Sequence, residues 1–344
     1  MAFTTDIIED VTEGLVIERL TKEMKEQARM MGRTEARFLV DTYYQVQEGR
    51  KRANNQLRAG LKPQTDEPAW PLMEWIAGHQ ESLEDRIRSL LGEYARAQRP
   101  GRWALSVHGI GPVISAGLLA HIDITKAYTA GHIWSFAGLN PDAEWYGRER
   151  AAAIVKEVAA ASVLKGEGLL LAVATHAKRS PTFLNAMLVD RKTGERKAPT
   201  VTNLSAALAK RPWNAALKTL CWKASQSFVK VHNSEKDFYG HLYAQRKQVE
   251  IAANDAGQYA DQAAMKLEKY RIGQDTEAFK WYSIGKLPPA HIEARACRWT
   301  VKLFLSHWHR VAFECEFGRV PPPPYILTLP GHAHPIEPPG WPCD

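Results

Sequence analysis

Cysteine is scarce in this chain of 344 residues, and its spacing excludes two kinds of small architecture. The four cysteines, Cys221, Cys297, Cys315 and Cys343, form no Cys-x-x-Cys pair. Zinc ribbons and disulfide scaffolds both depend on closely placed cysteines. The sequence therefore predicts neither, and separate thiols of this kind fit a reducing cytoplasm.

Long hydrophobic runs are absent as well. No stretch approaches the roughly 20 apolar residues of a membrane span. The N-terminal sequence MAFTTDIIEDVTEGL is acidic, whereas the start of a secretory signal peptide is basic. We therefore expect a cytoplasmic protein with no membrane partner.

The alternating pattern of β-strands is also rare, and helical periodicity takes its place. Apolar residues recur at intervals of three and four between residues 14 and 48, and one apolar stripe follows residues 72–96 until QRPG ends that helix. Further helices are predicted over 150–180, 204–233, 235–270 and 289–313. No repeated strand–helix–strand spacing is present. The sequence predicts an all-α fold.

Composition divides the chain into three regions. A helical N-terminal region covers residues 1–70, a main helical domain covers 71–317, and a tail covers 318–344. The tail holds nine of the twenty prolines, so it cannot form a helix or a central strand. It is predicted to be either extended against the body of the protein or mobile.

The segment HGIGPV at 108–113 predicts two helices joined by a tight turn. Gly109 and Gly111 permit backbone conformations that a Cβ disfavours, and Pro112 suits the first turn of a helix. Such a turn directs the N–H groups of residues 109–114 outward at the positive end of a helix dipole, where a phosphate oxygen can bind. This is the physical basis of the helix-hairpin-helix, which grips a nucleic-acid backbone without reading bases. A plain packing turn is the alternative.

The hairpin is one of several motifs that occur in a characteristic order. The long helix at 72–96 precedes VHGIGPVISAGLLAHID at 107–123 and IWSFAGLNP at 133–141. Two helical segments follow, PWNAALKTLCWKASQSFVKVHNSEKDFYGHLYAQR at 212–246 and HIEARACRWTVKLFLSHWHRVAF at 291–313. As an ordered set they resemble the C-terminal domain of transposases of the insertion-sequence-110/116/902 type. The resemblance covers residues 72–145 and 205–313, and implies an insertion at about 146–204.

Two features of that family are missing here. Family members begin with a nuclease-like domain on a mixed sheet that carries four acidic metal ligands, whereas residues 1–70 predict helices. The family's reactive serine lies in a Gly/Ser-rich stretch after the AGLxP signature. The serine at that place, Ser162, lies in alanine-rich helical sequence and is interpreted as a surface or packing residue.

The resemblance thus implies a nucleic-acid-binding protein related to mobile-element transposases, without their catalytic residues. Two alternatives stay open. One is an active transposase or recombinase that uses another nucleophile. The other is a structural or protein-interaction protein that kept the fold.

Basic residues around these motifs extend the predicted interface. On the last helix Arg295, Arg298 and Lys302 are spaced to share one face, with a solvated helix surface as the alternative. The loop DRKTGERK at 190–197 is either an electrostatic contact or a solubilising insertion. A base-stacking role for Trp145 would require its exposure. The residues predicted to bind nucleic acid are Gly109, Ile110, Gly111, Val113, Arg148, Arg150, Arg191, Lys192, Lys210, Arg211, Arg295, Arg298 and Lys302.

Charge and composition complete the predicted partners. The net charge of +7 and the isoelectric point near 9.1 suit a polyanion, and DNA is the predicted one. The resemblance adds structured RNA. The helix at 72–96 is a candidate seam for a homodimer. No metal or cofactor is predicted, because His307 and His309 lie two apart on a helix and point to different sides.

Overall fold

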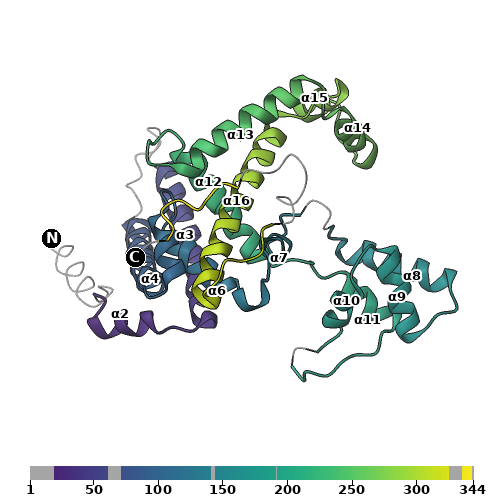
Figure 1. The fold of residues 1–344 in the computed structure, drawn as a ribbon, viewed down its shortest axis with the longest axis horizontal. Helices are drawn as coiled ribbons and strands as arrows, with labels where there is room; N and C mark the ends of the chain where they lie inside the picture. Colours follow the sequence, from purple (N-terminus) through teal and green to yellow (C-terminus); the bar gives the residue numbers. More distant parts are fainter. Residues whose placement is uncertain (1–18, 61–70, 141–143, 191, 325–334, 343–344) are drawn as a thin grey trace, which may run out of the picture. The chain divides into compact units, whose positions relative to one another are not determined.

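The computed structural model describes residues 19–60, 71–140, 144–190, 192–324 and 335–342, and it is helical throughout (Figure 1). These residues form fifteen α-helices and one short 3-10 helix but no strand, and a single antiparallel bridge joins Val189 to Arg196. The predicted all-α fold is confirmed. Within the same residues, no helix has the length and apolar character needed to cross a membrane.

The chain divides into two compact units. The first consists of residues 1–130 together with 220–344, and the second consists of residues 131–219. The predicted insertion at about 146–204 falls inside the second unit. The first unit is therefore built from two separated stretches of sequence.

Five helices make up the N-terminal stretch of the first unit. They are α2 (Lys22–Arg29), α3 (Arg33–Gly60), α4 (Pro71–Arg96), α5 (Arg99–Ser106) and α6 (Pro112–His121), followed by the 3-10 helix η1 (Ile124–Lys126). Helix α4 confirms the predicted helix at 72–96, but QRPG also starts α5. Ile87, Leu91 and Tyr94 of the apolar stripe of α4 are buried, whereas Leu83 is exposed, and α4 packs against α2, α3 and α6 of the same chain. The stripe that suggested a dimer seam thus contributes to the core.

The C-terminal stretch of the first unit supplies the other helices of that core. They are α12 (Ala215–Val231), α13 (Phe238–Asp255), α14 (Ala260–Lys269), α15 (Glu277–Ser283) and α16 (Pro289–Phe317). The part of α12 before Leu220 belongs to the second unit. Helices α13 and α16 lie side by side (Figure 1). The rings of Trp103 and Phe304 stack with centroids 6.0 Å apart, and those of Phe228 and Tyr239 lie 4.9 Å apart. This aromatic cluster joins α5 to α12, α13 and α16, and so connects the two stretches.

Residues 335–342 of the proline-rich tail, which turn at 339–340, pack against the helices of the first unit. The indole N–H of Trp103 donates to the Pro339 carbonyl at 2.9 Å, and the indole N–H of Trp341 donates to the Glu314 carboxylate at 2.7 Å. His307 donates from Nε2 to the Ile336 carbonyl at 2.6 Å. Of the two alternatives for the tail, this segment therefore adopts the packed one.

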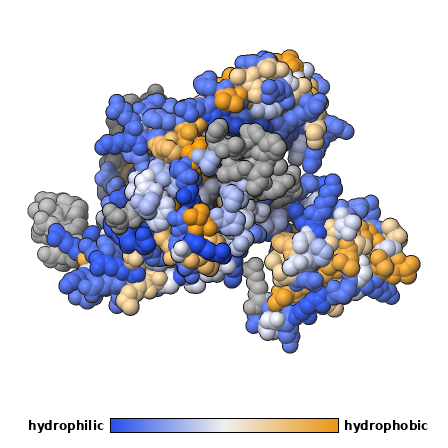
Figure 2. Space-filling model, in the orientation of Figure 1, coloured by the Kyte–Doolittle hydropathy of each residue, from blue (hydrophilic) through white to orange (hydrophobic). Residues whose placement is uncertain are grey.

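The second unit is a small helical bundle with an aliphatic core. It contains α7 (Ala130–Phe136), α8 (Gly147–Ala161), α9 (Gly166–His176), α10 (Pro181–Met187) and α11 (Val201–Leu208). Helices α8, α9, α10 and α11 share one core, which buries Val155, Leu170, Val173, Leu184 and Leu204. Figure 2 shows hydrophobic residues on the visible face of this unit, and the loop residue Val163 is 98% exposed.

Candidate nucleic-acid interface

The turn at 107–111 forms the predicted hairpin. Helix α5 ends at Ser106 and α6 begins at Pro112, with Gly111 as its N-cap residue. Gly109 has φ of +86°, a conformation that favours glycine, and the amide of Ile110 donates to the Val107 carbonyl at 3.0 Å. The sequence therefore predicted the turn and the role of Gly109 correctly, but it was wrong about Gly111, whose φ of −94° is open to any residue.

The inner side of the hairpin is fixed against α12. The Gly109 carbonyl accepts a hydrogen bond from the Ser227 hydroxyl at 2.5 Å. A Cβ at Gly109 would lie 3.1 Å from Cγ2 of Val231, so α12 leaves no room for a side chain there. Ile110 and Val113 are only 5% and 7% exposed, backbone included. These two residues therefore pack the turn.

The outer side of the hairpin is open. Among the described residues, no side chain caps the start of α6, and none has an atom within 4 Å of a Cβ built at Gly111. Helix geometry leaves the first amides of α6 without an acceptor inside the helix, and they include the amide of Val113. The Ile110 amide, by contrast, is already bonded to Val107. The open start of α6 can therefore accept one anion.

A buried acid lies near this turn. Asp237 is fully buried, and neither of its carboxylate oxygens has a well-aligned hydrogen-bond partner in the described chain. Burial raises the pKa of this carboxyl, while the Gly240 amide and the nearby His108, His241 and His232 oppose the rise. When it is ionised, this carboxyl weakens the attraction of the hairpin for an anion.

The predicted basic face of the last helix is only partly present in α16. The Arg295 guanidinium donates from Nε to the Glu250 carboxylate at 2.6 Å and from Nη1 to Gln262 at 3.2 Å. Glu250 is 1% exposed, so Arg295 compensates a buried charge instead of facing solvent. Arg298 is exposed and Lys302 is half-buried. The sequence pattern missed the pairing because Glu250 lies on a different helix, α13.

Most of the other predicted cations lie in the second unit. Arg148, Arg150, Lys192, Lys210 and Arg211 are exposed there, and Arg191 lies outside the described residues. Arg150 pairs with the Glu144 carboxylate at 2.6 Å. Helices α8 and α11 and the loops beside them therefore carry the predicted cations of this unit, while the hairpin belongs to the first unit.

The loop at 190–197 is less available to a polyanion than its composition suggests. Lys197 pairs with Asp190 at 2.9 Å, and Arg196 pairs with Glu167 at 2.5 Å. The Lys192 amide donates to the Asp190 carboxylate at 2.8 Å, which closes the turn. Half of the basic residues of this loop are thus neutralised inside the unit.

Sequence reasoning missed Arg179 and the aromatic residues that hold the cations of this unit. The Arg179 guanidinium lies 5.2 Å from the centre of the Tyr146 ring, and its Nε and Nη2 are buried without a partner in the described chain. Arg150 lies 5.0 Å from the same ring, and Arg211 lies 4.4 Å from the Trp145 ring. The only signal for Arg179 in the sequence was its place beside Lys178 after an apolar helix.

Two motifs of the predicted transposase-like set also meet in this unit. A Cβ at Gly138 of AGLNP would lie 2.6 Å from the Trp213 ring of PWNAALK, and Gly138 has φ of +65°. The Asn214 amide donates to the Phe136 carbonyl at 2.8 Å. The Trp213 ring in turn lies 4.2 Å from the Lys218 ammonium. The glycine of AGLNP therefore permits this close packing.

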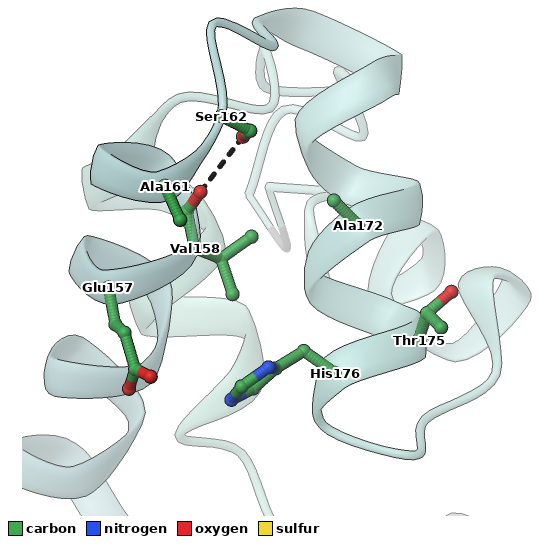
Figure 3. Close-up of a pocket in the computed structure, with 7 residues that line it drawn as sticks. All are labelled: Glu157, Val158, Ala161, Ser162, Ala172, Thr175 and His176. Carbon is green, nitrogen blue, oxygen red and sulfur yellow. Dashed lines mark hydrogen bonds between the residues drawn. The ribbon is translucent and has the colours of Figure 1, made fainter.

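Ser162 lines a hollow of about 440 Å³ between α8 and α9 (Figure 3). The Ser162 hydroxyl donates to the Val158 carbonyl at 2.8 Å, one turn back in α8. Figure 3 shows Ser162 and His176 at opposite ends of the hollow, with Val158 and Ala172 between them. The two side chains do not form a nucleophile–base pair, so the arrangement agrees with a packing role for Ser162.

Comparisons of the chain with protein-family models, curated proteins and solved structures found no match. The resemblance to transposase domains therefore depends on the sequence motifs alone. Within the described residues, no group of three or more His, Cys, Asp or Glu side chains is placed to hold a metal ion. The hairpin and the distribution of charge are accordingly the features that bear on function.

Proposed function

We propose that this protein binds nucleic acid, DNA in the first place, through the phosphate backbone, with the hairpin as one contact. The observation that carries the proposal is the open, uncapped start of α6 at Gly111, on a turn that α12 holds rigidly. Backbone amides at such a helix start bind a phosphate oxygen without rearrangement of the protein.

This mode of binding has two consequences that can be measured. Amides that contact phosphate read no base, so the proposed binding is weakly sequence-specific. Neutralising phosphates releases counterions, so the affinity falls steeply with added salt. The net charge of +7 supports attraction of a polyanion over distances longer than the hairpin itself.

The proposal is tested best at Gly111. The substitution Gly111→Asp introduces a good N-cap residue, which stabilises the helix by roughly a few tenths of a kcal/mol relative to glycine, and it places a carboxylate where the phosphate would bind. Gly78→Asp is the matched control, because Gly78 is exposed on α4 and a Cβ there also meets nothing within 4 Å. Both variants change the net charge equally.

The measurement is a titration of duplex DNA, branched DNA and structured RNA at low salt. We expect Gly111→Asp to weaken binding at least tenfold, while Gly78→Asp weakens it less than threefold. Equal binding by the two variants would show that the hairpin does not contact the nucleic acid. If the wild-type protein binds no nucleic acid at low salt, the proposal fails and the protein-interaction alternative gains support.

A further inference from the structure

The excess positive charge of the chain lies almost entirely in one of its two units. Residues 131–219 contain thirteen Lys and Arg against seven Asp and Glu, a net charge of +6. The remaining residues contain 32 Lys and Arg against 31 Asp and Glu, a net charge of +1. Attraction of a polyanion is therefore concentrated in the second unit, which does not contain the hairpin.

The cations of the second unit are held in two different ways. In the loop at 190–197, Arg196 and Lys197 pair with carboxylates. Elsewhere cations lie over aromatic rings, and we call this set the cation–aromatic surface. Its members are Trp145, Tyr146, Arg150, Arg179, Arg211, Trp213 and Lys218.

The two arrangements differ in what they leave for a ligand. A carboxylate neutralises its cation, whereas an aromatic ring attracts the cation and leaves its charge in place. A stacked guanidinium is also ordered beforehand, so less conformational entropy is lost when its N–H edge meets a phosphate. Arg211 is the clearest case, because its side chain is exposed and no carboxylate among the described residues pairs with it. Arg179 is half-buried and its Nε and Nη2 are enclosed by protein, so a phosphate can reach only the remaining part of its guanidinium. Arg150 is the weakest, because it also pairs with Glu144.

We infer that the cation–aromatic surface is a second contact for the nucleic-acid backbone, with Arg179 and Arg211 as its principal phosphate ligands. This inference rests on the proposed function and deepens it. The surface takes phosphates rather than bases. Trp145 is 45% exposed, but Arg211 lies over one face of its ring, 4.4 Å from the ring centre, so that face is not open to a stacked base.

The test compares two double variants of the full chain with the same change of charge. Arg179→Gln with Arg211→Gln removes two stacked cations, and Arg196→Gln with Lys197→Gln removes two paired ones. Binding of duplex DNA and of structured RNA is measured at several salt concentrations. Each lost phosphate contact lowers the slope of log K against log salt by about 0.9 on duplex DNA. We expect Arg179→Gln with Arg211→Gln to lower the slope by about 2 and to weaken binding at least tenfold. We expect Arg196→Gln with Lys197→Gln to weaken binding less than threefold.

The outcomes separate this inference from the proposed function. If both double variants weaken binding equally, only net charge matters and the inference is overturned. If Gly111→Asp weakens binding but the stacked pair does not, the inference is wrong while the proposed function stands. Because Arg179 is half-buried, Arg211→Gln alone is measured beside Lys197→Gln, and both are checked for folding by circular dichroism. Tighter binding of one polymer shows whether DNA or RNA uses the surface.

Discussion

The two units handle polar groups in opposite ways. The buried polar and charged side chains of the described residues all belong to the first unit, and Glu84, Asp237, Glu250, His307 and His309 are among them. The second unit buries aliphatic side chains and keeps most of its charged side chains exposed, although Arg179 is half-buried. The first unit thus uses polar networks to fix its interior, whereas the second leaves its charges available to other molecules.

This difference separates the conditions to which each unit responds. Buried titratable groups make stability depend on pH, because the folded and unfolded states bind protons differently. Exposed, uncompensated cations make binding depend on salt. We therefore expect pH to act on the stability of the first unit, and salt to act on binding by the second.

The largest expected effect is a loss of stability of the first unit, caused by a substitution in the hairpin. Gly109→Val introduces a β-branched residue at a positive φ and against Val231, Ser227 and Phe228. Backbone strain and overpacking together lower the free energy of unfolding by about 3 kcal/mol or more. Amide hydrogen exchange in α5, α6 and α12 measures this loss.

The control is Gly111→Ala, since an added Cβ at Gly111 meets no atom within 4 Å and the φ there is −94°. We expect Gly111→Ala to cost less than about 1 kcal/mol. Similar losses in the two variants would contradict the close packing of Gly109 on α12. Because a side chain at Gly109 would disturb the fold and one at Gly111 would not, Gly111 is the better position for testing binding.

The second effect is a loss of stability of the first unit in acid. His307 is buried, accepts a hydrogen bond from the Tyr239 hydroxyl at Nδ1 and donates from Nε2 to the Ile336 carbonyl, so it is neutral. Burial lowers its pKa to about 4. The unfolded state therefore takes up a proton at higher pH than the folded state does. Stability is complete above about pH 6.5 and falls by about 1.4 kcal/mol for each pH unit toward 4.

The matched variant for this effect is His307→Gln. Its amide group can donate to the Ile336 carbonyl and accept from Tyr239, but it does not titrate. Between pH 6.5 and 5 the wild-type protein loses about 2 kcal/mol more than His307→Gln, as measured by urea unfolding at a series of pH values. Parallel pH profiles for the two proteins would show that His307 is not the titrating group.

The smallest expected effect tests whether Arg295 stabilises the fold while Arg211 contributes to binding. Arg295→Met removes one of the cations that pair with Glu250, while Arg246 and the Tyr259 hydroxyl remain as partners. We expect the unfolding free energy to fall by about 1 to 2 kcal/mol. The salt slope for DNA binding stays unchanged, in contrast to Arg211→Gln. A reduced salt slope in Arg295→Met would indicate that Arg295 of α16 contacts the DNA, contrary to this prediction.

The local features of the fold could be predicted from the sequence. Helix periodicity predicted α4 and α16, and the glycines and Pro112 predicted the hairpin, because these features are set by residues close together in the chain. The pairing of Arg295 with Glu250 and the stacking of Arg179 on Tyr146 could not be predicted. Each joins residues far apart in the sequence, so only the packing of helices brings them together.

The interrupted order of the first unit sets the order of assembly during synthesis. Residues 1–130 leave the ribosome before their partners at 220–344 exist, and the whole second unit is made in between. Gly117 of α6 illustrates the delay, because the side chain of Leu220, which packs against it, is translated about a hundred residues later. The second unit, whose residues form one continuous stretch of sequence, is complete first. The nascent chain must therefore keep the apolar faces of α5 and α6 uncovered until its last helices emerge.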